Sequence, residues 1–188
     1  MTYRYIIIKI IIYNYNILKY LKMNNKKLNE IKVFTDGSFK KLKIGIACGY
    51  GIYFPKEELP NLGRAFKHEP LTNQRAELYA IYKAIRTIVK SKLNWDLIHI
   101  YTDSEYSIKS LTEWVKNWEL NNWKNSKGED VMNQDIIRPI YKILKKNKNK
   151  IIFTHVRSHT GATNFESISN DMADKLANEG AFKSLKIN

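Results

Sequence analysis

The chain has very little cysteine, and this excludes two common kinds of stabilising site. Its 188 residues include a single cysteine, Cys48, so no internal disulfide can form, and one thiol is the wrong count for a zinc site. Cys48 lies in an apolar run at residues 44–49, which predicts a small core residue and permits a reducing compartment. No internal repeat is present, so repeat architectures are not expected.

A hydrophobic run of membrane-spanning length is also missing. Residues 5–18 are rich in Ile and Tyr, but Lys9, Asn14 and Asn16 interrupt them, and the stretch is too short for a spanning helix. No small-residue cleavage site follows it, so a secretory signal is not expected. The default expectation is an intracellular protein (cytoplasm or nucleus) with no membrane partner.

The N-terminal residues differ in composition from the remainder. We expect residues 1–30 to be an extension outside the core and residues 31–188 to form one domain. The polar residues 23–27 are typical of a solvated linker. Met23 is interpreted as an alternative start, and residues 1–22 as dispensable for catalysis.

Acidic residues are scarce relative to basic ones. The chain has 18 Asp and Glu against 32 Lys and Arg, a formal net charge of +14, of which residues 1–30 contribute +5 and the body +9. A basic body favours a polyanionic partner, most simply nucleic acid. A solvated basic surface, or a bias toward Lys in an AT-rich coding sequence, is the alternative explanation.

The hydrophobic pattern predicts an α/β fold. Asp36-Gly37 and Lys40-Lys41 are expected to mark a bend that follows the first strand. A helix with apolar positions from Leu78 to Val89 should begin at Thr72 or Asn73. Strands are predicted at residues 31–34, 45–54, 62–66, 97–101 and 151–156, with further helices after residue 103, after residue 133 and at residues 167–183.

Four carboxylates stand in separate predicted elements. Asp36 is expected at the exit of the first strand, Glu77 one turn into a helix, Asp103 at the end of the fourth strand and Asp174 in the last helix. Each has an ordinary explanation: a turn residue, an acid near a helix N-terminus, an N-cap and a surface acid, respectively. Gathered in one site, they would repel one another unless a hard cation such as Mg²⁺ neutralised them. Such a site in a basic chain indicates metal-dependent phosphodiester chemistry.

Four motifs around these acids and two further motifs are distinctive when taken together. They are Phe34-Thr35-Asp36-Gly37-Ser38, Thr72-Asn73-Gln74-Arg75-Ala76-Glu77, Tyr101-Thr102-Asp103-Ser104, Trp114-Val115-Lys116-Asn117-Trp118, Ser158-His159-Thr160-Gly161 and Ala173-Asp174-Lys175-Leu176-Ala177. This set resembles the type 1 ribonuclease H family. The resemblance covers roughly residues 31–183 and implies a ribonuclease H-like fold. That fold has a five-stranded mixed sheet, three antiparallel strands continued by two parallel strands, flanked by helices.

The resemblance implies an endonuclease that hydrolyses the RNA strand of RNA–DNA hybrids. Asp36, Glu77, Asp103 and Asp174 would hold two Mg²⁺ ions, or Mn²⁺, and the products would carry 5′-phosphate and 3′-hydroxyl ends. His159 matches a loop histidine that assists water activation or product departure. A monomer is expected.

Substrate contacts are implied in the same way. Asn73 and Gln74 match residues that touch RNA 2′-hydroxyls, the group that distinguishes RNA from DNA. Thr72 and Asn133 match residues that hold a DNA phosphate. The residues that match the family's DNA channel are Trp114, Trp118 and Ser126. The two tryptophans are four residues apart, hence on one helix face, and a core stripe is the alternative for them.

The chain departs from the family pattern in four places. Residues 119–122 read Glu-Leu-Asn-Asn after Trp118 where lysines are usual, so the basic handle is expected to bind hybrid more weakly than in other members. Residues 69–71 read Glu-Pro-Leu where an arginine can bind phosphate. The loop between His159 and Asp174 is longer than usual, which makes Asp171 an alternative to Asp174. The N-terminal hybrid-binding module of many eukaryotic members is not recognisable in residues 1–30.

Two other functions fit the same fold. A non-catalytic nucleic-acid-binding module is expected to lose at least one metal carboxylate, whereas all four are present here. A resolvase or integrase of the wider superfamily would act on duplex DNA, where residues that read 2′-hydroxyls, such as Asn73 and Gln74, have no use.

Overall fold

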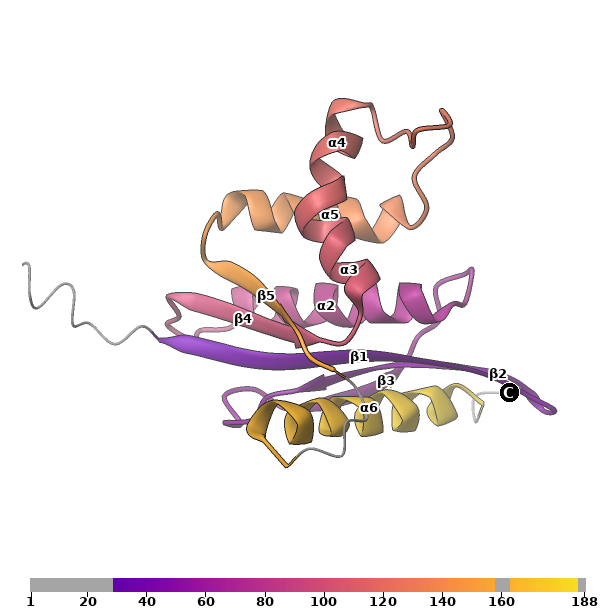
Figure 1. Cartoon of the computed structure of the whole chain (residues 1–188). Coiled ribbons are helices and arrows are strands. Elements are labelled where there is room, and N and C mark those ends of the chain that lie inside the picture. The colour runs from indigo at the N-terminus through magenta and orange to yellow at the C-terminus, as the bar shows by residue number, and fades with distance from the viewer. Residues whose placement is uncertain (1–28, 158–162, 186–188) are drawn as a thin grey trace, which may run out of the picture.

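The computed structural model describes residues 29–157 and 163–185, and its centre is a five-stranded sheet (Figure 1). The strand order is β3-β2-β1-β4-β5. The β1–β2 and β2–β3 pairs are antiparallel, and the β1–β4 and β4–β5 pairs are parallel, which confirms the predicted mixed sheet. The strands are β1 (Glu30–Leu42), β2 (Gly45–Tyr53), β3 (Leu62–Ala65), β4 (Leu97–Thr102) and β5 (Ile151–His155).

Helices cover both faces of this sheet. In Figure 1, α2 and the α3–α5 region lie on one side of the sheet and α6 lies on the other. The segment from α3 to α4 runs without a break through a π-helical turn, η1, a feature often found near functional sites. The helices are α2 (Asn73–Lys90), α3 (Glu105–Lys109), η1 (Ser110–Trp114), α4 (Val115–Leu120), α5 (Gln134–Lys146) and α6 (Phe165–Ser184).

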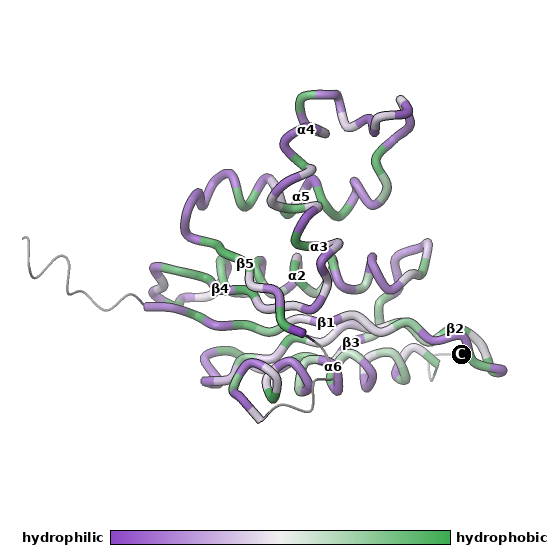
Figure 2. The backbone as a smooth tube through the Cα atoms, viewed as in Figure 1, coloured by the Kyte–Doolittle hydropathy of each residue, from purple (hydrophilic) through white to green (hydrophobic). Residues whose placement is uncertain are grey.

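The main core lies between the sheet and α2. Leu78, Ile81, Ile85 and Ile88 recur at helical spacing on α2 and are fully buried. They pack against strand residues such as Ile100, within one continuous cluster that extends to α5. Figure 2 shows that hydrophobic positions are spread through the strands and helices, whereas the loop after α4 is mainly hydrophilic. The core therefore fixes α2, and with it the motif at its N-terminus.

The other face of the sheet holds α6 at unusually short range. A Cβ placed on Gly51 of β2 would lie 2.1 Å from the carbonyl oxygen of Ala173, and one on Gly49 would lie 2.0 Å from the amide nitrogen of Ala181. Side chains at these two glycines would push the helix away. Because small residues stand on both sides of the contact, α6 lies directly on β2 and its carboxylate Asp174 is brought close to β1.

The predicted bend at Asp36-Gly37 is wrong. β1 continues through both residues to Leu42, and Asp36 pairs with Gly51 of β2 within the sheet rather than at a strand exit. The turn instead follows Leu42, at Lys43 and Ile44. Asp-Gly is a common turn dipeptide, but here the glycine allows a helix to approach the strand.

The remaining element predictions agree with the structure within about two residues. Thr72 is the N-cap of α2, and its hydroxyl accepts from the amide of Arg75. Asn164 caps α6, so this helix begins at Phe165 rather than at residue 167. Cys48 is fully buried, as predicted. Among the helices in the described ranges, none combines the length and apolar character needed to cross a membrane. Residues 1–28, the bulk of the predicted extension, lie outside the described residues.

Candidate active site

Asp36 is the most deeply placed of the four carboxylates. It stands in the middle of β1, the central strand of the sheet, and only 6% of its surface is exposed. Burial, first, and then the negative charges of Asp103, Asp174 and Glu77 together raise its pKa from 3.8 to about 8, against a hydrogen bond from the Gly37 backbone that lowers it. All three other predicted carboxylates are therefore near enough to act on Asp36 electrostatically.

Glu77 reaches this group because Gly37 has no side chain. A Cβ on Gly37 would lie 2.5 Å from the Glu77 amide nitrogen, so the first turn of α2 rests on the β1 backbone. The Glu77 carboxylate accepts a hydrogen bond from Asn73 at 2.6 Å and one from the Ser104 hydroxyl at 2.5 Å. Burial raises its pKa, the Ser104 hydrogen bond lowers it, and Asp103 raises it.

Asp103 follows β4 directly, at the edge where β1 and β4 run parallel. The N-cap of the next helix is Ser104, whose hydroxyl accepts from the Ser107 amide, so the N-cap explanation of Asp103 is wrong. Asp103 is partly exposed and is therefore available to a ligand. His155, at the end of β5, contacts the Asp103 carbonyl oxygen through Nε2 at 3.1 Å.

Asp174 is fixed to β1 by a short relay. Asn178, one turn later on α6, donates to the Asp174 carboxylate at 2.9 Å and accepts from the Ser38 hydroxyl of β1 at 2.8 Å. Asp174 raises the pKa of Asp36, whereas Asp171 is exposed and is not among the groups that do so. The geometry favours Asp174 over Asp171 as the fourth carboxylate.

The four carboxylates form a donor set suited to a hard divalent cation. Their oxygens are the ligands that Mg²⁺ or Mn²⁺ prefers. The pKa of Asp36 is raised first by burial and then by repulsion from the other three acids, and a cation would offset both. Within residues 29–157 and 163–185, no three His, Cys, Asp or Glu side chains are already drawn into a metal-binding cluster. Glu77 accepts hydrogen bonds from the Asn73 amide and the Ser104 hydroxyl, and Asp174 accepts one from the Asn178 amide.

The predicted contacts to RNA and to the DNA phosphate lie at the N-terminus of α2. Thr72, Asn73 and Gln74 are exposed, and Asn73 also donates to Glu77, which ties a predicted substrate contact to a carboxylate. His159, the predicted loop histidine, lies outside the described residues.

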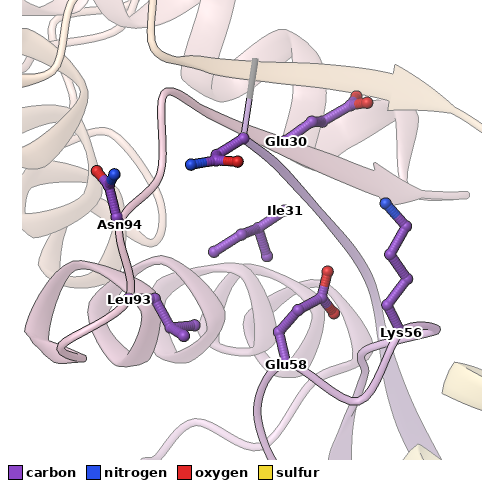
Figure 3. A pocket seen from close by; sticks show the side chains of 7 residues that line it. Glu30, Ile31, Lys56, Glu58, Leu93 and Asn94 are labelled. Carbon is purple, nitrogen blue, oxygen red and sulfur yellow. The ribbon is translucent and has the colours of Figure 1, made fainter. Parts of the chain in front are cut away.

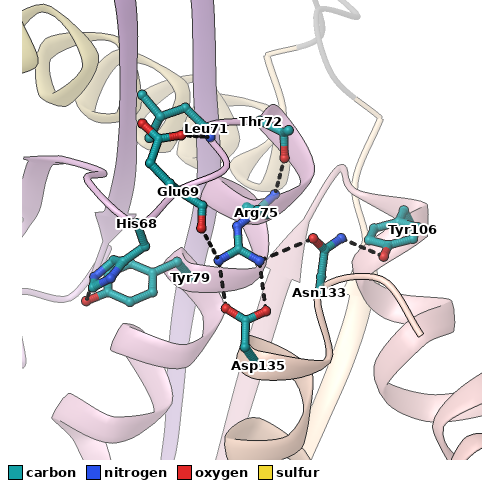
Figure 4. A network of polar contacts seen from close by, with 9 residues as sticks. All are labelled: His68, Glu69, Leu71, Thr72, Arg75, Tyr79, Tyr106, Asn133 and Asp135. Atoms are coloured by element: carbon teal, nitrogen blue, oxygen red, sulfur yellow. Dashed lines mark hydrogen bonds and ion pairs between the residues drawn. The ribbon is translucent and has the colours of Figure 1, made fainter. Parts of the chain in front are cut away.

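Asn133 is joined to the same region by a network that the sequence did not predict (Figure 4). The Arg75 side chain is 5% exposed and donates to both carboxylate oxygens of Asp135, at 2.8 and 2.7 Å. Its guanidinium also reaches the Asn133 side-chain oxygen at 3.5 Å, while the Asn133 amide donates to the Tyr106 hydroxyl at 2.8 Å. Asn133 holds the N-cap position of α5 without a side-chain cap. A buried arginine thus links Thr72 and Asn133, the two predicted phosphate contacts.

The predicted DNA-channel residues line one groove of about 400 Å³. The rings of Trp114 and Trp118 lie 5.8 Å apart, and Ser126, in the loop after α4, lines the same groove. Trp114 is 37% exposed, while Trp118 packs partly against the core, so the core explanation holds for part of Trp118 and the channel assignment stays a prediction. Of the described residues that line this groove, Lys124 alone is a cation, and it pairs with Asp130 at 2.9 Å.

Sequence reasoning missed the residues that support the site: Gly37 as a contact surface, Arg75, Ser104 and Asn178. For two of these residues, the sequence spacing from a predicted site residue could have indicated the contact. Asn178 follows Asp174 by four residues and Arg75 follows Thr72 by three, which places each pair on one helix face.

Comparison with known proteins gives a consistent result. The family model described as RNase H matches residues 28–182. The chain is 42% identical over 140 residues to the "Probable ribonuclease H" of Acanthamoeba polyphaga mimivirus, covering 74% of this chain and 60% of that protein. It is 31% identical to the "Ribonuclease H" of Orientia tsutsugamushi, covering 84% and 85%. The solution structure of the PFV RNase H domain superposes with a TM-score of 0.66 at 26% identity, covering 84% and 97%.

Proposed function

The chain belongs to the RNase H family, and we propose that it is an endonuclease that hydrolyses the RNA strand of RNA–DNA hybrids. The observation that carries the proposal is the convergence of Asp36, Glu77, Asp103 and Asp174 where β4 ends beside the middle of β1. Gly37 lets α2 rest on β1, Ser104 donates to Glu77, and Asn178 ties Asp174 to β1. The raised pKa of Asp36 agrees with this grouping. The family match supports the reaction class, and the four carboxylates supply what that reaction needs.

The proposed mechanism uses the carboxylates to hold two Mg²⁺ or Mn²⁺ ions. When bound, such a pair activates the attacking water and stabilises the leaving 3′ oxygen of an in-line displacement on phosphorus. The new bond forms between the water oxygen and phosphorus, and the bond to the 3′ oxygen breaks. The products therefore carry 5′-phosphate and 3′-hydroxyl ends. His159 would assist by moving a proton near the water or the departing product.

The protein's own residues would place the scissile phosphate. Asn73 and Gln74 would contact 2′-hydroxyls of the RNA strand, which restricts cleavage to RNA. Thr72 and Asn133 would hold a phosphate of the DNA strand, and the Trp114–Trp118 groove would receive its sugars. Asn73 connects recognition to chemistry, because it donates to Glu77 from the same turn of α2. We also propose that the catalytic domain is residues 31–188 and that residues 1–30 are an extension.

A cleavage assay on three substrates tests the proposal. Labelled RNA–DNA hybrid, duplex RNA and duplex DNA are incubated with the chain in Mg²⁺ and in chelator. We expect cutting of the hybrid alone, internally, in the RNA strand and only with Mg²⁺. Chelator-resistant cutting or equal cutting of duplex DNA would overturn the proposal. Hybrid binding without any cleavage would indicate the non-catalytic module.

A further inference from the structure

Besides the channel groove, two hollows in the described structure are lined by none of the four carboxylates, and they differ in charge. One, of about 430 Å³, lies where β1 begins and is drawn in Figure 3. Its charged side chains are Glu30, Glu58 and Lys56, so acids outnumber bases there. The other, of about 450 Å³, lies along α5 and the end of α4. We call it the α5 groove.

The α5 groove is strongly basic. One acid, Glu119, faces four cations on a single helix. Arg138, Lys142, Lys145 and Lys146 recur at spacings of three and four residues, which places them along one side of α5. Lys145 pairs with Glu119 at 2.8 Å, whereas no ion pair is found for Lys142 or Lys146 in the described part of the chain. The groove therefore keeps an excess of positive charge that a polyanion could neutralise.

Aromatic rings alternate with these cations. The Arg138 guanidinium lies 4.6 Å from the centre of the Trp123 ring, and the Lys145 ammonium lies 5.5 Å from that of Tyr141. Trp123 is held in the left-handed region, with φ of 62°, as is the preceding Asn122, with φ of 50°. For a bulky residue this conformation is strained, so the surrounding structure holds the Trp123 backbone in place at some cost. Rings beside cations are the usual platform for unpaired bases.

The groove adjoins the predicted DNA channel. The Trp123 amide donates to the Trp118 carbonyl oxygen at 2.6 Å, so one short segment carries the aromatic side chains of both surfaces. The channel itself is poor in available charge, because Lys124 is paired with Asp130. The cations that a nucleic acid would need beyond the channel are on α5.

We propose that the α5 groove binds a single-stranded extension of the nucleic acid whose hybrid portion occupies the active site. Phosphates would pair with Lys142 and Lys146, and a base would stack on the Trp123 or Tyr141 ring. A single strand fits better than a duplex because its bases are free to stack on side-chain rings. This proposal rests on the proposed function, since the hybrid portion orients the strand.

The test compares hybrids with and without single-stranded tails. Binding is measured by fluorescence anisotropy in Mg²⁺ with full-length Asp103→Asn protein, which should bind hybrid without cutting it. The substrates share one hybrid core and differ in an RNA or DNA tail at either end, so the preferred strand is identified. One stacked base adds roughly 1–3 kcal/mol, so the favoured tail should improve affinity by at least about fivefold.

The Lys142→Glu/Lys146→Glu variant should abolish that tail preference and reduce the salt dependence of tailed-hybrid binding by about 1 to 2 in log–log slope. Lys41→Glu/Lys43→Glu is the matched control: it makes the same charge change at the exposed β1–β2 turn and should keep the preference. Equal loss in both variants, a preference that survives in the α5 variant, or no preference for any tail would overturn the proposal. Cleavage of blunt hybrid by the unmodified chain is measured separately, so a failure of the proposed function is distinguished from a failure of this one.

Discussion

The carboxylate edge (Asp36, Glu77, Asp103 and Asp174, where β4 ends beside β1) and the α4–α5 region hold their functional side chains in opposite ways. Asp36 is paired into a central strand, and Glu77 and Asp174 each accept hydrogen bonds from neighbours that are themselves fixed. In the α4–α5 region the functional side chains are half-exposed rings and long cations, and Leu120 beside them is 85% exposed.

This difference follows from what each region has to do. Chemistry requires groups held to within about half an ångström, which only packed backbone and hydrogen-bonded neighbours provide. Contacts to phosphates and sugars tolerate movement, because charge attraction falls off slowly with distance. Changes at the carboxylate edge should therefore alter turnover steeply, and changes in the α4–α5 region should alter affinity in small steps.

The largest effect is expected at Asp103. Asp103→Asn keeps the size of the side chain but removes one negative charge from the cation-binding set, so metal-dependent turnover should fall by several orders of magnitude while hybrid binding is kept. Steady-state cleavage and anisotropy measure the two quantities. Asp171→Asn, the same change at an exposed acid, is the control and should leave turnover intact. If Asp171→Asn lost turnover and Asp174→Asn did not, the fourth carboxylate would be misassigned.

A second large effect is expected from pH in metal-free protein. Burial and the neighbouring acids raise the pKa of Asp36 from 3.8 to about 8, so the folded state keeps a proton that the unfolded chain has lost between these values. The unfolded state then binds fewer protons, and the free energy of unfolding falls as pH rises from about 4 to about 8. Urea denaturation in chelator at pH 5 and pH 8 measures this.

Two comparisons isolate the cause of that pH dependence. Asp36→Asn removes the titrating group, and its stability should change less over the same pH range. Mg²⁺ should raise stability more at pH 8 than at pH 5, because a cation replaces the proton among the four carboxylates. The prediction would be contradicted if the free energy of unfolding rose between pH 5 and pH 8 and Asp36→Asn removed that rise.

A side chain at Gly37 should test how closely α2 has to pack on β1 for stability and turnover. In Gly37→Ala the new Cβ would lie 2.5 Å from the Glu77 amide nitrogen and 2.9 Å from the Ala76 carbonyl carbon, both backbone atoms that cannot move alone. We expect a loss of roughly 2–3 kcal/mol in unfolding free energy, and a loss of turnover because Glu77 shifts from Asp36. Gly128→Ala is the control, since a Cβ there meets nothing within 4 Å, although its φ of +79° carries a smaller backbone cost. Equal effects at both glycines would show that close packing at Gly37 is unimportant.

The same glycine marks the limit of what the sequence could predict. The four carboxylates were identifiable because each lies in a distinctive motif, and the strand and helix order followed from periodicity. Asp36-Gly37 was wrongly predicted to be a bend, because this dipeptide is common in turns. Here Gly37 is needed for its contact with the backbone of Glu77 on α2, forty residues later in the sequence. Ser104 and Asn178 were missed for a related reason: each also bonds a residue of another element, Glu77 of α2 and Ser38 of β1, respectively. The order of helices and strands follows from local sequence patterns, whereas the contacts that hold the site residues join elements that are distant in the sequence.

Arg75 connects the two regions, and its removal should have an intermediate effect. Arg75→Met leaves Asp135 without its bidentate partner, but the Asp135 side chain is 59% exposed and can be rehydrated, so about 2 kcal/mol of stability should be lost rather than more. Because Asn133 also loses a partner, KM for hybrid should rise more than kcat falls. Urea denaturation and steady-state kinetics measure the two effects.

The control for Arg75 is Arg86→Met, a change at an exposed arginine of the same helix that contacts Tyr82. It should change stability by no more than about 0.5 kcal/mol. A double-mutant cycle with Asp135→Asn separates the pair from other contacts: a coupling near zero would show that Arg75 acts through packing alone.

The smallest effect is expected at Trp114 in the channel. Its ring is 37% exposed and packs edge-on against Tyr106, so Trp114→Leu removes contact area from the proposed DNA strand but leaves the core nearly intact. KM should rise by roughly three- to tenfold, equivalent to about 0.7–1.4 kcal/mol, with kcat unchanged because no carboxylate moves. Leu120→Ala, a change at a more exposed apolar residue that does not line the channel, should change neither constant. A fall in kcat for Trp114→Leu would mean that the α4–α5 region positions the reacting phosphate as well as holding the strand, and the separation between the two regions would then be wrong.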